Sequence, residues 1–306
     1  MYRNQNLRGD MSKLHDLLDT NPVLLADGAM GTMLFDAGLE SGASPEMWNV
    51  EHADAVKAIH RGYAEAGSQL ILTNSFGGTR FRLALHNLED RLYELNKAAA
   101  VIAREAVAGV AHTVLIGGSI GPTGELLDPL GVMTFEEAVA GFAEQAAALR
   151  DGGVDYFQIE TMSDPREVDT AVQGIRRVSD LPIITTMTFD TNRHTMMGTT
   201  PADAARTLSG FGVDVIGANC GNGVEDLIWA VGEMHAAAPA ALLFAKSNAG
   251  IPRYEQGGGF TYDGTPDVMA DYAVRAKAAG ARLIGACCGS TPAHLHAMGV
   301  ALGLLS

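Results

Sequence analysis

Residues 282–290 read RLIGACCGS, where a short apolar run ends in Cys287 and Cys288 and a glycine follows at once. The third cysteine of the chain, Cys220, lies in a segment of the same design, IGANCGNG at residues 216–223. In both segments the apolar run predicts a short buried strand. If the two strands belong to one parallel sheet, all three thiols reach the same edge of it. Three thiolates that meet there would bind a soft or borderline cation, and zinc fits best.

Simpler explanations exist for each of these cysteines. A single buried cysteine usually behaves as a small hydrophobic residue. A disulfide between Cys287 and Cys288 would be strained, because adjacent residues fit disulfide geometry poorly. A structural zinc site with four cysteine ligands is excluded, since the chain has only three cysteines. The position of all three at predicted strand ends beside glycine favours the metal site over these alternatives.

The strand–loop–helix pattern of this segment recurs along the chain from residue 22 onward. Apolar runs predict eight strands, at Val23–Ala26, Leu70–Thr73, Val114–Gly117, Tyr156–Ile159, Pro182–Met187, Val213–Ile216, Ala241–Ala245 and Arg282–Ile284. Alanine-rich amphipathic segments predict helices at Ala53–Ala66, Thr79–Val107, Thr134–Asp151, Asp164–Val178, Pro201–Gly210, Val224–Ala236, Thr265–Ala279 and Thr291–Gly299. Such alternation predicts a single (β/α)8 domain, a TIM barrel, at residues 22–306. Residues 1–21 are expected to form a leading segment whose short helix, Ser12–Leu18, covers the bottom of the barrel.

A doubly wound open sheet is the alternative fold for this alternation. Its dinucleotide-binding members carry a GxGxxG fingerprint in the first turn, whereas residues 27–32 read DGAMGT. A Walker A lysine motif is absent from the sequence as well. The barrel therefore remains the predicted fold, and its active site is expected at the carboxyl ends of the strands.

The composition of the chain argues against several classes of partner. The chain has 306 residues, of which 47% are hydrophobic and 19% are charged, as in proteins with a sizeable buried core. Its net charge of −15 argues against binding to nucleic acid or to anionic membranes. No apolar run is long enough to span a membrane, and the polar N-terminus lacks the apolar core of a secretory signal. With so few cysteines, the chain is expected to be cytoplasmic, and a homo-oligomer is left open.

Nearly every predicted strand delivers a polar group or a thiol to its carboxyl end. In chain order these groups are Asp27, Thr73, Ser119, Glu160, Thr186, Asn219, Lys246 and Cys287. A serine, threonine or aspartate at such a place caps the next helix more often than it takes part in catalysis. Asp27 and Glu160 are harder to explain in this way, because each directly ends an apolar strand, where an unpaired carboxylate is costly.

These strand ends resemble those of the homocysteine S-methyltransferase family, which includes betaine–homocysteine methyltransferase and the homocysteine domain of cobalamin-dependent methionine synthase. The motifs run in family order across nearly the whole chain: DGAMGT at 27–32, TNSF at 73–76, GSIGP at 118–122, IET at 159–161, GANC at 217–220, NAG at 248–250 and GACCG at 285–289. The two cysteine motifs together with the DGAMG start are highly specific to the family. The family fold is the same (β/α)8 barrel.

The resemblance implies a reaction and a site. Homocysteine would be methylated to methionine, and Cys220, Cys287 and Cys288 would ligate one catalytic zinc ion per chain. Asp27 and Glu160 would hold the amino end of homocysteine. Further contacts are expected from Gly28, Thr73, Ser119 and Asn219, the last of which would support the zinc loop. The chemistry agrees with these residue types, because zinc deprotonates a bound thiol, and three protein ligands leave one position open for it.

The methyl donor is the part of the reaction that the resemblance leaves most open. The chain looks closest to bacterial betaine–homocysteine methyltransferases, so betaine is favoured. S-methylmethionine, dimethylsulfoniopropionate or a separate corrinoid methyl carrier are the alternatives. Onium cations are usually held by aromatic faces, and Trp48 and Phe76 are the best candidates. Animal betaine enzymes have a tyrosine after the strand 2 motif and another after the strand 4 glutamate, where this chain has Gly77 and Thr161. The donor pocket is therefore expected to differ from theirs.

Two interpretations do not involve methyl transfer. Lys246 ends a predicted strand of the barrel, where it would suit a Schiff-base aldolase, but that reading leaves the meeting of the cysteines unexplained. The other is a non-catalytic protein that binds zinc and a thiol without turning it over. Turnover of homocysteine would separate it from an enzyme.

Overall fold

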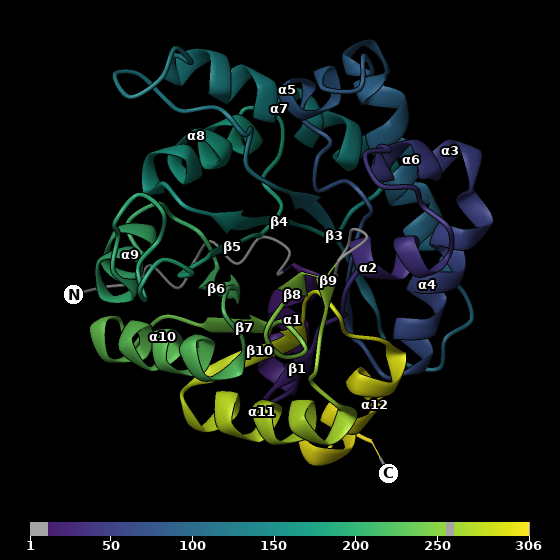
Figure 1. The fold of residues 1–306 in the computed structure, drawn as a ribbon, viewed down its shortest axis with the longest axis vertical. Coiled ribbons are helices and arrows are strands. Elements are labelled where there is room, and N and C mark those ends of the chain that lie inside the picture. The colour runs from purple at the N-terminus through teal and green to yellow at the C-terminus, as the bar shows by residue number, and fades with distance from the viewer. Residues whose placement is uncertain (1–11, 255–259, 306) are drawn as a thin grey trace.

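The computed structural model describes residues 12–254 and 260–305, and its centre is a parallel sheet of eight strands (Figure 1). The strands are β1 Leu24–Leu25, β2 Leu70–Leu72, β3 Leu115–Ile120, β4 Tyr156–Met162, β5 Ile183–Met187, β6 Val215–Cys220, β7 Leu243–Ser247 and β10 Ala281–Ala286. Their order is β1-β10-β7-β6-β5-β4-β3-β2, and a parallel bridge between Ala26 and Leu70 joins β1 to β2. The ring is thereby closed, and the predicted (β/α)8 barrel is confirmed.

Helices surround the strands, as Figure 1 shows. They are α2 Gly31–Asp36, α3 Trp48–Glu51, α4 Ala53–Glu65, α5 Arg80–Ala84, α6 Leu92–Ala106, α7 Phe135–Gly152, α8 Pro165–Arg176, α9 Pro201–Leu208, α10 Val224–Ala237, α11 Pro266–Ala278 and α12 Pro292–Ala301, with the short 3₁₀ helices η1 Pro45–Met47 and η2 Glu89–Arg91. The single helix predicted at Thr79–Val107 is wrong, because the structure divides it into α5, η2 and α6. Asn87 follows α5 with a φ of 57°, a left-handed value that an α-helix cannot continue through.

The lower end of the barrel is closed by α1, Lys13–Thr20, close to the helix predicted there. The Ser12 side chain caps this helix by accepting a hydrogen bond from the backbone N–H of His15. Leu14 and Leu18 pack against the apolar side chains that fill the barrel, which are Leu24, Ala26, Leu70, Leu72, Leu115, Tyr156, Ile184, Val215, Phe244 and Leu283. The interior of this end of the barrel is therefore filled by packed apolar side chains.

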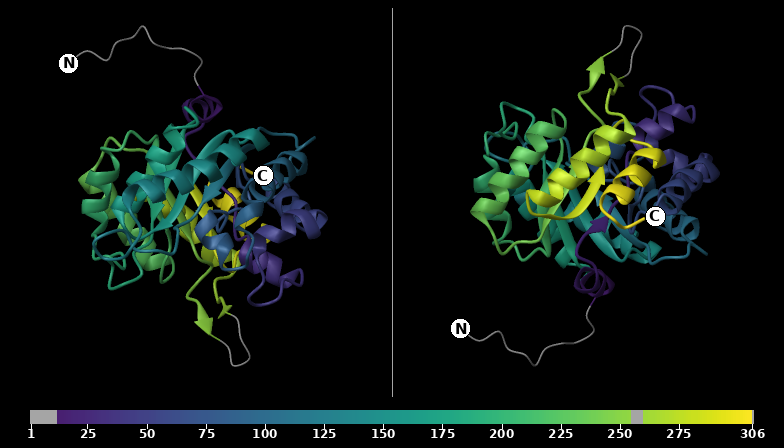
Figure 2. Two further views of the ribbon diagram at one scale, coloured as in Figure 1. Left: turned by 90° about the horizontal axis from the view of Figure 1, so that it is seen from above. Right: turned by 90° about the horizontal axis from the view of Figure 1, so that it is seen from below.

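The opposite end carries a two-stranded hairpin, formed by β8 Arg253–Tyr254 and β9 Phe260–Thr261 (Figure 2). Asp263 ties its base together, because the carboxylate accepts hydrogen bonds from the backbone N–H of Ile251 and from the Arg253 guanidinium. The hairpin follows β7, so it stands over the carboxyl ends of the strands. Within the described ranges of the chain, no helix has the length and apolar character needed to cross a membrane.

Candidate functional site

The three cysteines meet at the carboxyl end of the barrel. Cys220 ends β6, and Cys287 and Cys288 directly follow β10; β6 and β10 are the two neighbours of β7 in the sheet. The Sγ atoms of Cys220 and Cys287 are 2.9 Å apart, and all three Sγ atoms lie within 4.8 Å of one another. This spacing allows one metal ion to contact all three sulfurs, and a donor set of three thiols suits zinc.

The backbone turns sharply at both cysteine segments. Cys220 has a φ of 59°, which is uncommon for a residue with a side chain, and Gly221 continues the turn with a φ of 79°. Gly289 has a φ of 80°, and a Cβ atom there would lie 2.2 Å from the ring of Tyr262. The glycines beside the cysteines are therefore required by the fold of the site, since they allow the sulfurs to converge and the Tyr262 ring to pack closely.

A cavity of about 380 Å³ opens beside the three sulfurs at the mouth of the barrel. Of the residues predicted from the sequence, those that line it are Asp27, Gly28, Thr73, Phe76, Ser119, Glu160, Lys246, Cys220, Cys287 and Cys288. Asn219 does not line it, but its side chain donates to the hydroxyl of Thr161 and to Cys220 Sγ and so supports the cysteine from behind. Trp48 does not line the cavity either; its side chain is buried, and its ring packs against that of His52 with the two planes tilted by 42°.

Four charged side chains line this cavity. Glu46 is held by the Ser44 hydroxyl and the Gly77 N–H, and the other three, Asp27, Glu160 and Lys246, are called the charged set below. Lys246 Nζ donates to Asp27 Oδ1 at 2.8 Å, and both side chains are 5% exposed. Asp27 Oδ2 accepts a hydrogen bond from the backbone N–H of Leu72 at 2.8 Å. Glu160 Oε1 accepts one from the Ser119 hydroxyl at 2.5 Å. The two carboxylates predicted to act in the site are thus held by different partners.

The surroundings of the charged set shift its pKa values. Burial raises the pKa of Asp27 and of Glu160, and attraction by Lys246 opposes this rise in both. Burial by itself would lower the pKa of Lys246, but the charges of Asp27 and Glu160 raise it overall. Lys246 is therefore held as a protonated ammonium group. An amine held in that form is a poor nucleophile, which argues against the aldolase interpretation.

The thiols share hydrogen bonds with one another and with Tyr262. Hydrogen bonds from Cys220 and Cys287 lower the pKa of Cys288, and a hydrogen bond from Tyr262 acts in the same direction. The pKa of Cys287 is raised by its hydrogen bonds to the other two cysteines. Tyr262 is a site residue that sequence reasoning missed. It follows the hairpin rather than a barrel strand, and the only signal for it is the glycine at position 289 that makes room for its ring.

A second group of buried polar residues lies at the same end of the barrel but outside the cavity. Asn49, Asn96 and Gln145, called the amide set below, are each at most 2% exposed. Their side-chain amides donate to backbone oxygens of the loop that follows β2: Asn49 to Asn74 O, Asn96 to Gly78 O and Gln145 to Ser75 O, at 2.7–2.8 Å. The amide set therefore fixes the loop that carries Phe76.

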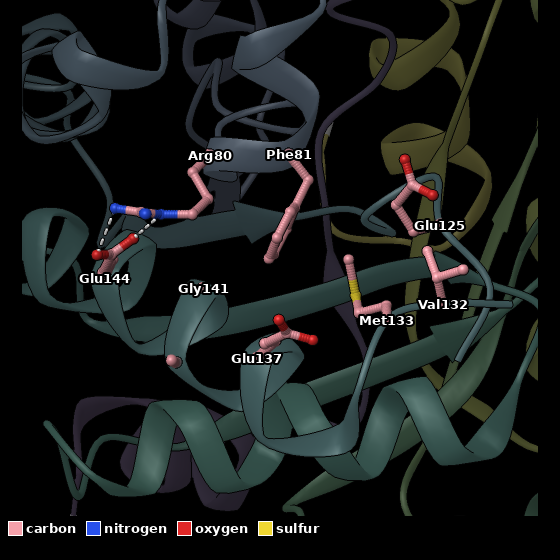
Figure 3. Close-up of a pocket in the computed structure, with 9 residues that line it drawn as sticks. Arg80, Phe81, Glu125, Val132, Met133, Glu137, Gly141 and Glu144 are labelled. Atoms are coloured by element: carbon pink, nitrogen blue, oxygen red, sulfur yellow. Dashed lines mark hydrogen bonds and ion pairs between the residues drawn. The ribbon is translucent and has the colours of Figure 1, made fainter. Parts of the chain in front are cut away.

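Another cavity, of about 490 Å³, lies between α5, the loop after β3 and α7 (Figure 3). Arg80 and Glu144 form an ion pair on one side of it, and Phe81 and Met133 supply apolar surface (Figure 3). It is larger than the cavity beside the thiols, but none of the cysteines and no residue of the charged set lines it. The thiol cavity is therefore the candidate active site, because it brings together the groups that can do chemistry.

Comparisons with known proteins identify the family of the chain. The family model for homocysteine S-methyltransferase matches residues 24–302. The methionine synthases of Mycobacterium leprae and Mycobacterium tuberculosis are 32% and 31% identical over 94% of this chain, which spans 25% of the length of each. The metallated form of the Escherichia coli homocysteine methyltransferase MmuM matches with a TM-score of 0.79 and 27% identity, over 94% of this chain and 99% of that one. Its oxidized form matches equally well, at 28% identity.

Proposed function

Because the chain belongs to the homocysteine S-methyltransferase family, we propose that it transfers a methyl group to the thiol of homocysteine and so forms methionine. The observation that carries the proposal is the convergence of Cys220, Cys287 and Cys288 beside a cavity that also contains a buried carboxylate with an open side, Glu160. A thiol that bears an amino group is the substrate that both features fit. The cavity volume of about 380 Å³ is ample for homocysteine and a small donor together.

We propose further that the three cysteines hold one zinc ion. A set of three thiolates is typical of zinc, and the sulfurs face the cavity, so a fourth position would be open to the substrate. When bound, the ion would keep the homocysteine sulfur deprotonated and nucleophilic at neutral pH. Asn219 would hold Cys220 in place for this purpose through its hydrogen bond to the sulfur.

The protein's own residues would mainly position the two reactants. The Glu160 carboxylate would accept hydrogen bonds from the ammonium group of homocysteine, and Ser119 keeps that carboxylate oriented. The sulfur would then attack the methyl carbon in line, so that the new carbon–sulfur bond forms as the bond between that carbon and the donor breaks. The leaving group departs with the electron pair of the broken bond, and an onium donor leaves as a neutral amine or thioether.

Betaine is the donor that we favour, with S-methylmethionine and dimethylsulfoniopropionate as alternatives. Phe76 supports a cationic donor, because it lines the cavity with its side chain partly exposed, and an aromatic face attracts an onium group. A separate corrinoid protein as the methyl source is the competing proposal. It draws on the likeness to methionine synthases, of which this chain spans a quarter.

One assay tests the reaction and the donor together. The purified protein, with its zinc content measured, is mixed with homocysteine and, in parallel, with betaine, S-methylmethionine, dimethylsulfoniopropionate or S-adenosylmethionine, and methionine is quantified. We expect methionine with betaine. If none of the donors gives methionine although zinc is bound at one ion per chain, the proposal of a free onium donor is overturned, and a corrinoid carrier or a binding role takes its place.

A further inference from the structure

The side-chain amide of Asn219 holds two residues of unusual backbone conformation at once. Cys220 has a φ of 59°, and Thr161, which directly follows Glu160, has a φ of 61°; such left-handed values are uncommon for residues with a side chain. Asn219 Oδ1 accepts a hydrogen bond from the Thr161 backbone N–H at 2.9 Å, and Nδ2 donates to the Thr161 hydroxyl at 2.7 Å and to Cys220 Sγ at 3.4 Å. One amide therefore joins the turn after Glu160 to a cysteine of the thiol cavity.

The turn at Thr161 belongs to an irregular stretch of the barrel sheet. The register of β4 against β5 shifts between Ile159 and Met162, and the Thr161 N–H finds its acceptor in the Asn219 side chain on β6. Irregularities of this kind often lie beside active sites, where they redirect a side chain. Glu160 lies within the stretch, so the amide that contacts the cysteine sulfur also fixes the backbone that carries this carboxylate.

Thr186 on β5 holds the amide itself in place. A backbone N–H can only donate, so the contact with Thr161 determines which end of the Asn219 amide is the oxygen. The Thr186 hydroxyl donates to that oxygen at 2.7 Å and accepts a hydrogen bond from the side chain of the fully buried Gln158 at 3.4 Å. Because its oxygen is bound twice, the amide keeps its N–H group toward Cys220. An N–H donor there stabilises the charge of a thiolate, whereas a carbonyl oxygen would repel it.

We propose that Thr186 is a positioning residue of the metal centre, which keeps the N–H group of Asn219 directed at Cys220 Sγ and so strengthens the binding of zinc by the three cysteines. Thr186 is fully buried and does not line the thiol cavity, so it acts through Asn219 and not on the substrate. The inference rests on the proposed function, because it takes the three cysteines as the zinc site. It gives a role to a residue that the strand-end pattern located without assigning it one.

The adjacent residue, Thr185, supplies a matched control. It is fully buried on the same strand, but its hydroxyl has no hydrogen-bond partner in the described part of the chain. Valine has the shape of threonine without the hydroxyl, so Thr185→Val and Thr186→Val make the same change on opposite faces of β5. Only the second removes a contact with Asn219. Losing an outer hydrogen bond of a metal site typically lowers metal affinity by about 10- to 100-fold.

The test measures the zinc affinity of the purified protein by competition with a chelator of known affinity. Thr186→Val is expected to weaken zinc binding at least about tenfold. Thr186→Ser, which keeps the hydroxyl, and Thr185→Val are expected to stay within about threefold of wild type. A hydroxyl that only supports the fold would instead lower the free energy of unfolding of the zinc-free protein and leave zinc affinity unchanged. Urea denaturation of the zinc-free variants measures that quantity.

Three outcomes would overturn the inference. If Thr186→Val keeps its zinc affinity within about threefold of wild type, the hydroxyl takes no part in holding the metal. If Thr185→Val weakens zinc binding as strongly as Thr186→Val, the packing of β5 is the cause and not the hydrogen bond. If Thr186→Ser binds zinc as poorly as Thr186→Val, the hydroxyl is not the group responsible.

Should Thr186→Val fail to fold, as judged by circular dichroism, Thr186→Ala takes its place. Alanine removes the same hydroxyl without placing a methyl group against the Asn219 amide, and wild-type zinc affinity in this variant would overturn the inference equally. Failure of the proposed function looks different, because the wild-type protein would then not bind one zinc ion per chain.

Discussion

The charged set and the amide set are both buried, both polar and both at the carboxyl end of the barrel, yet they are used differently. The amide set, Asn49, Asn96 and Gln145, directs its N–H groups at backbone oxygens of one loop. The charged set is only partly hydrogen-bonded, since one carboxylate oxygen of Glu160 has no hydrogen-bond partner in the described structure. Gln145 Oε1 also lacks a hydrogen-bond partner, but it is buried away from the cavity. An oxygen left without a partner beside a cavity, as in Glu160, is the one suited to a ligand.

Position relative to the cavity strengthens the contrast. All three members of the charged set line the cavity beside the thiols, whereas none of the amide set does. The amide set affects the cavity only indirectly, because the loop that it holds carries Phe76 to the cavity wall. We therefore expect substitutions in the two sets to affect different quantities, namely ligand binding in one case and the free energy of unfolding in the other.

The largest effect is expected from the thiols themselves. Replacing Cys220, Cys287 or Cys288 with alanine should reduce zinc from one ion per chain to almost none and lower methionine formation by at least about 10³-fold, because thiol activation depends on the ion. Metal analysis and the methionine assay on the same preparation check this. Full activity in a variant free of metal would refute the role assigned to the cysteines.

Glu160→Ala should have the next largest effect. Removing the carboxylate with the open oxygen should weaken homocysteine binding by about 100-fold, which is in the range for losing one partner of a buried charge pair. Zinc content should stay at the wild-type level, since Glu160 is not among the three groups placed to hold the ion. Calorimetric titration with homocysteine measures the first quantity and metal analysis the second. An unchanged affinity would show that the ammonium group binds elsewhere.

Much of this arrangement could be predicted from the sequence, because both a barrel strand and the position of its carboxyl end can be recognised from the order of residues. An apolar run followed by a polar residue locates Asp27, Glu160 and Cys220, and closure of the barrel brings them together. The pairing of Lys246 with Asp27 could not be predicted in this way. The two residues are 219 positions apart, and only the packing inside the closed ring decides which side chains touch.

Residues outside the strands were the least predictable. Trp48 begins the short helix α3, and its aromatic character predicted a donor pocket equally well as the burial against His52 that the structure shows. Tyr262 reaches Cys288 from the segment after the hairpin, whose position over the barrel mouth depends on the contacts of Asp263. The break between α5 and α6 depends on the left-handed conformation at Asn87. The sequence around Asn87 has helical periodicity and therefore predicts no break. In each case the outcome depends on tertiary contacts rather than on a local pattern.

The smallest effect on the reaction is expected from the amide set, and Gln145→Ala is the variant that sharpens the comparison. Gln145 is fully buried, and its amide donates to Ser75 O at 2.7 Å and to Asn96 Oδ1 at 3.1 Å. Removing it leaves two buried oxygens without this donor, which should lower the free energy of unfolding by about 1–3 kcal/mol. Urea denaturation measures this quantity.

Homocysteine affinity in Gln145→Ala should remain within about threefold of wild type, because the carboxylate that we assign to the substrate is held by Ser119 through a separate hydrogen bond. Glu160→Ala is the matched variant, since it also truncates a buried polar side chain at the same end of the barrel. If Gln145→Ala weakened homocysteine binding as strongly as Glu160→Ala does, while its stability stayed unchanged, the division into a ligand-binding set and a structural set would be wrong. The loop after β2 would then have to be counted as part of the homocysteine site.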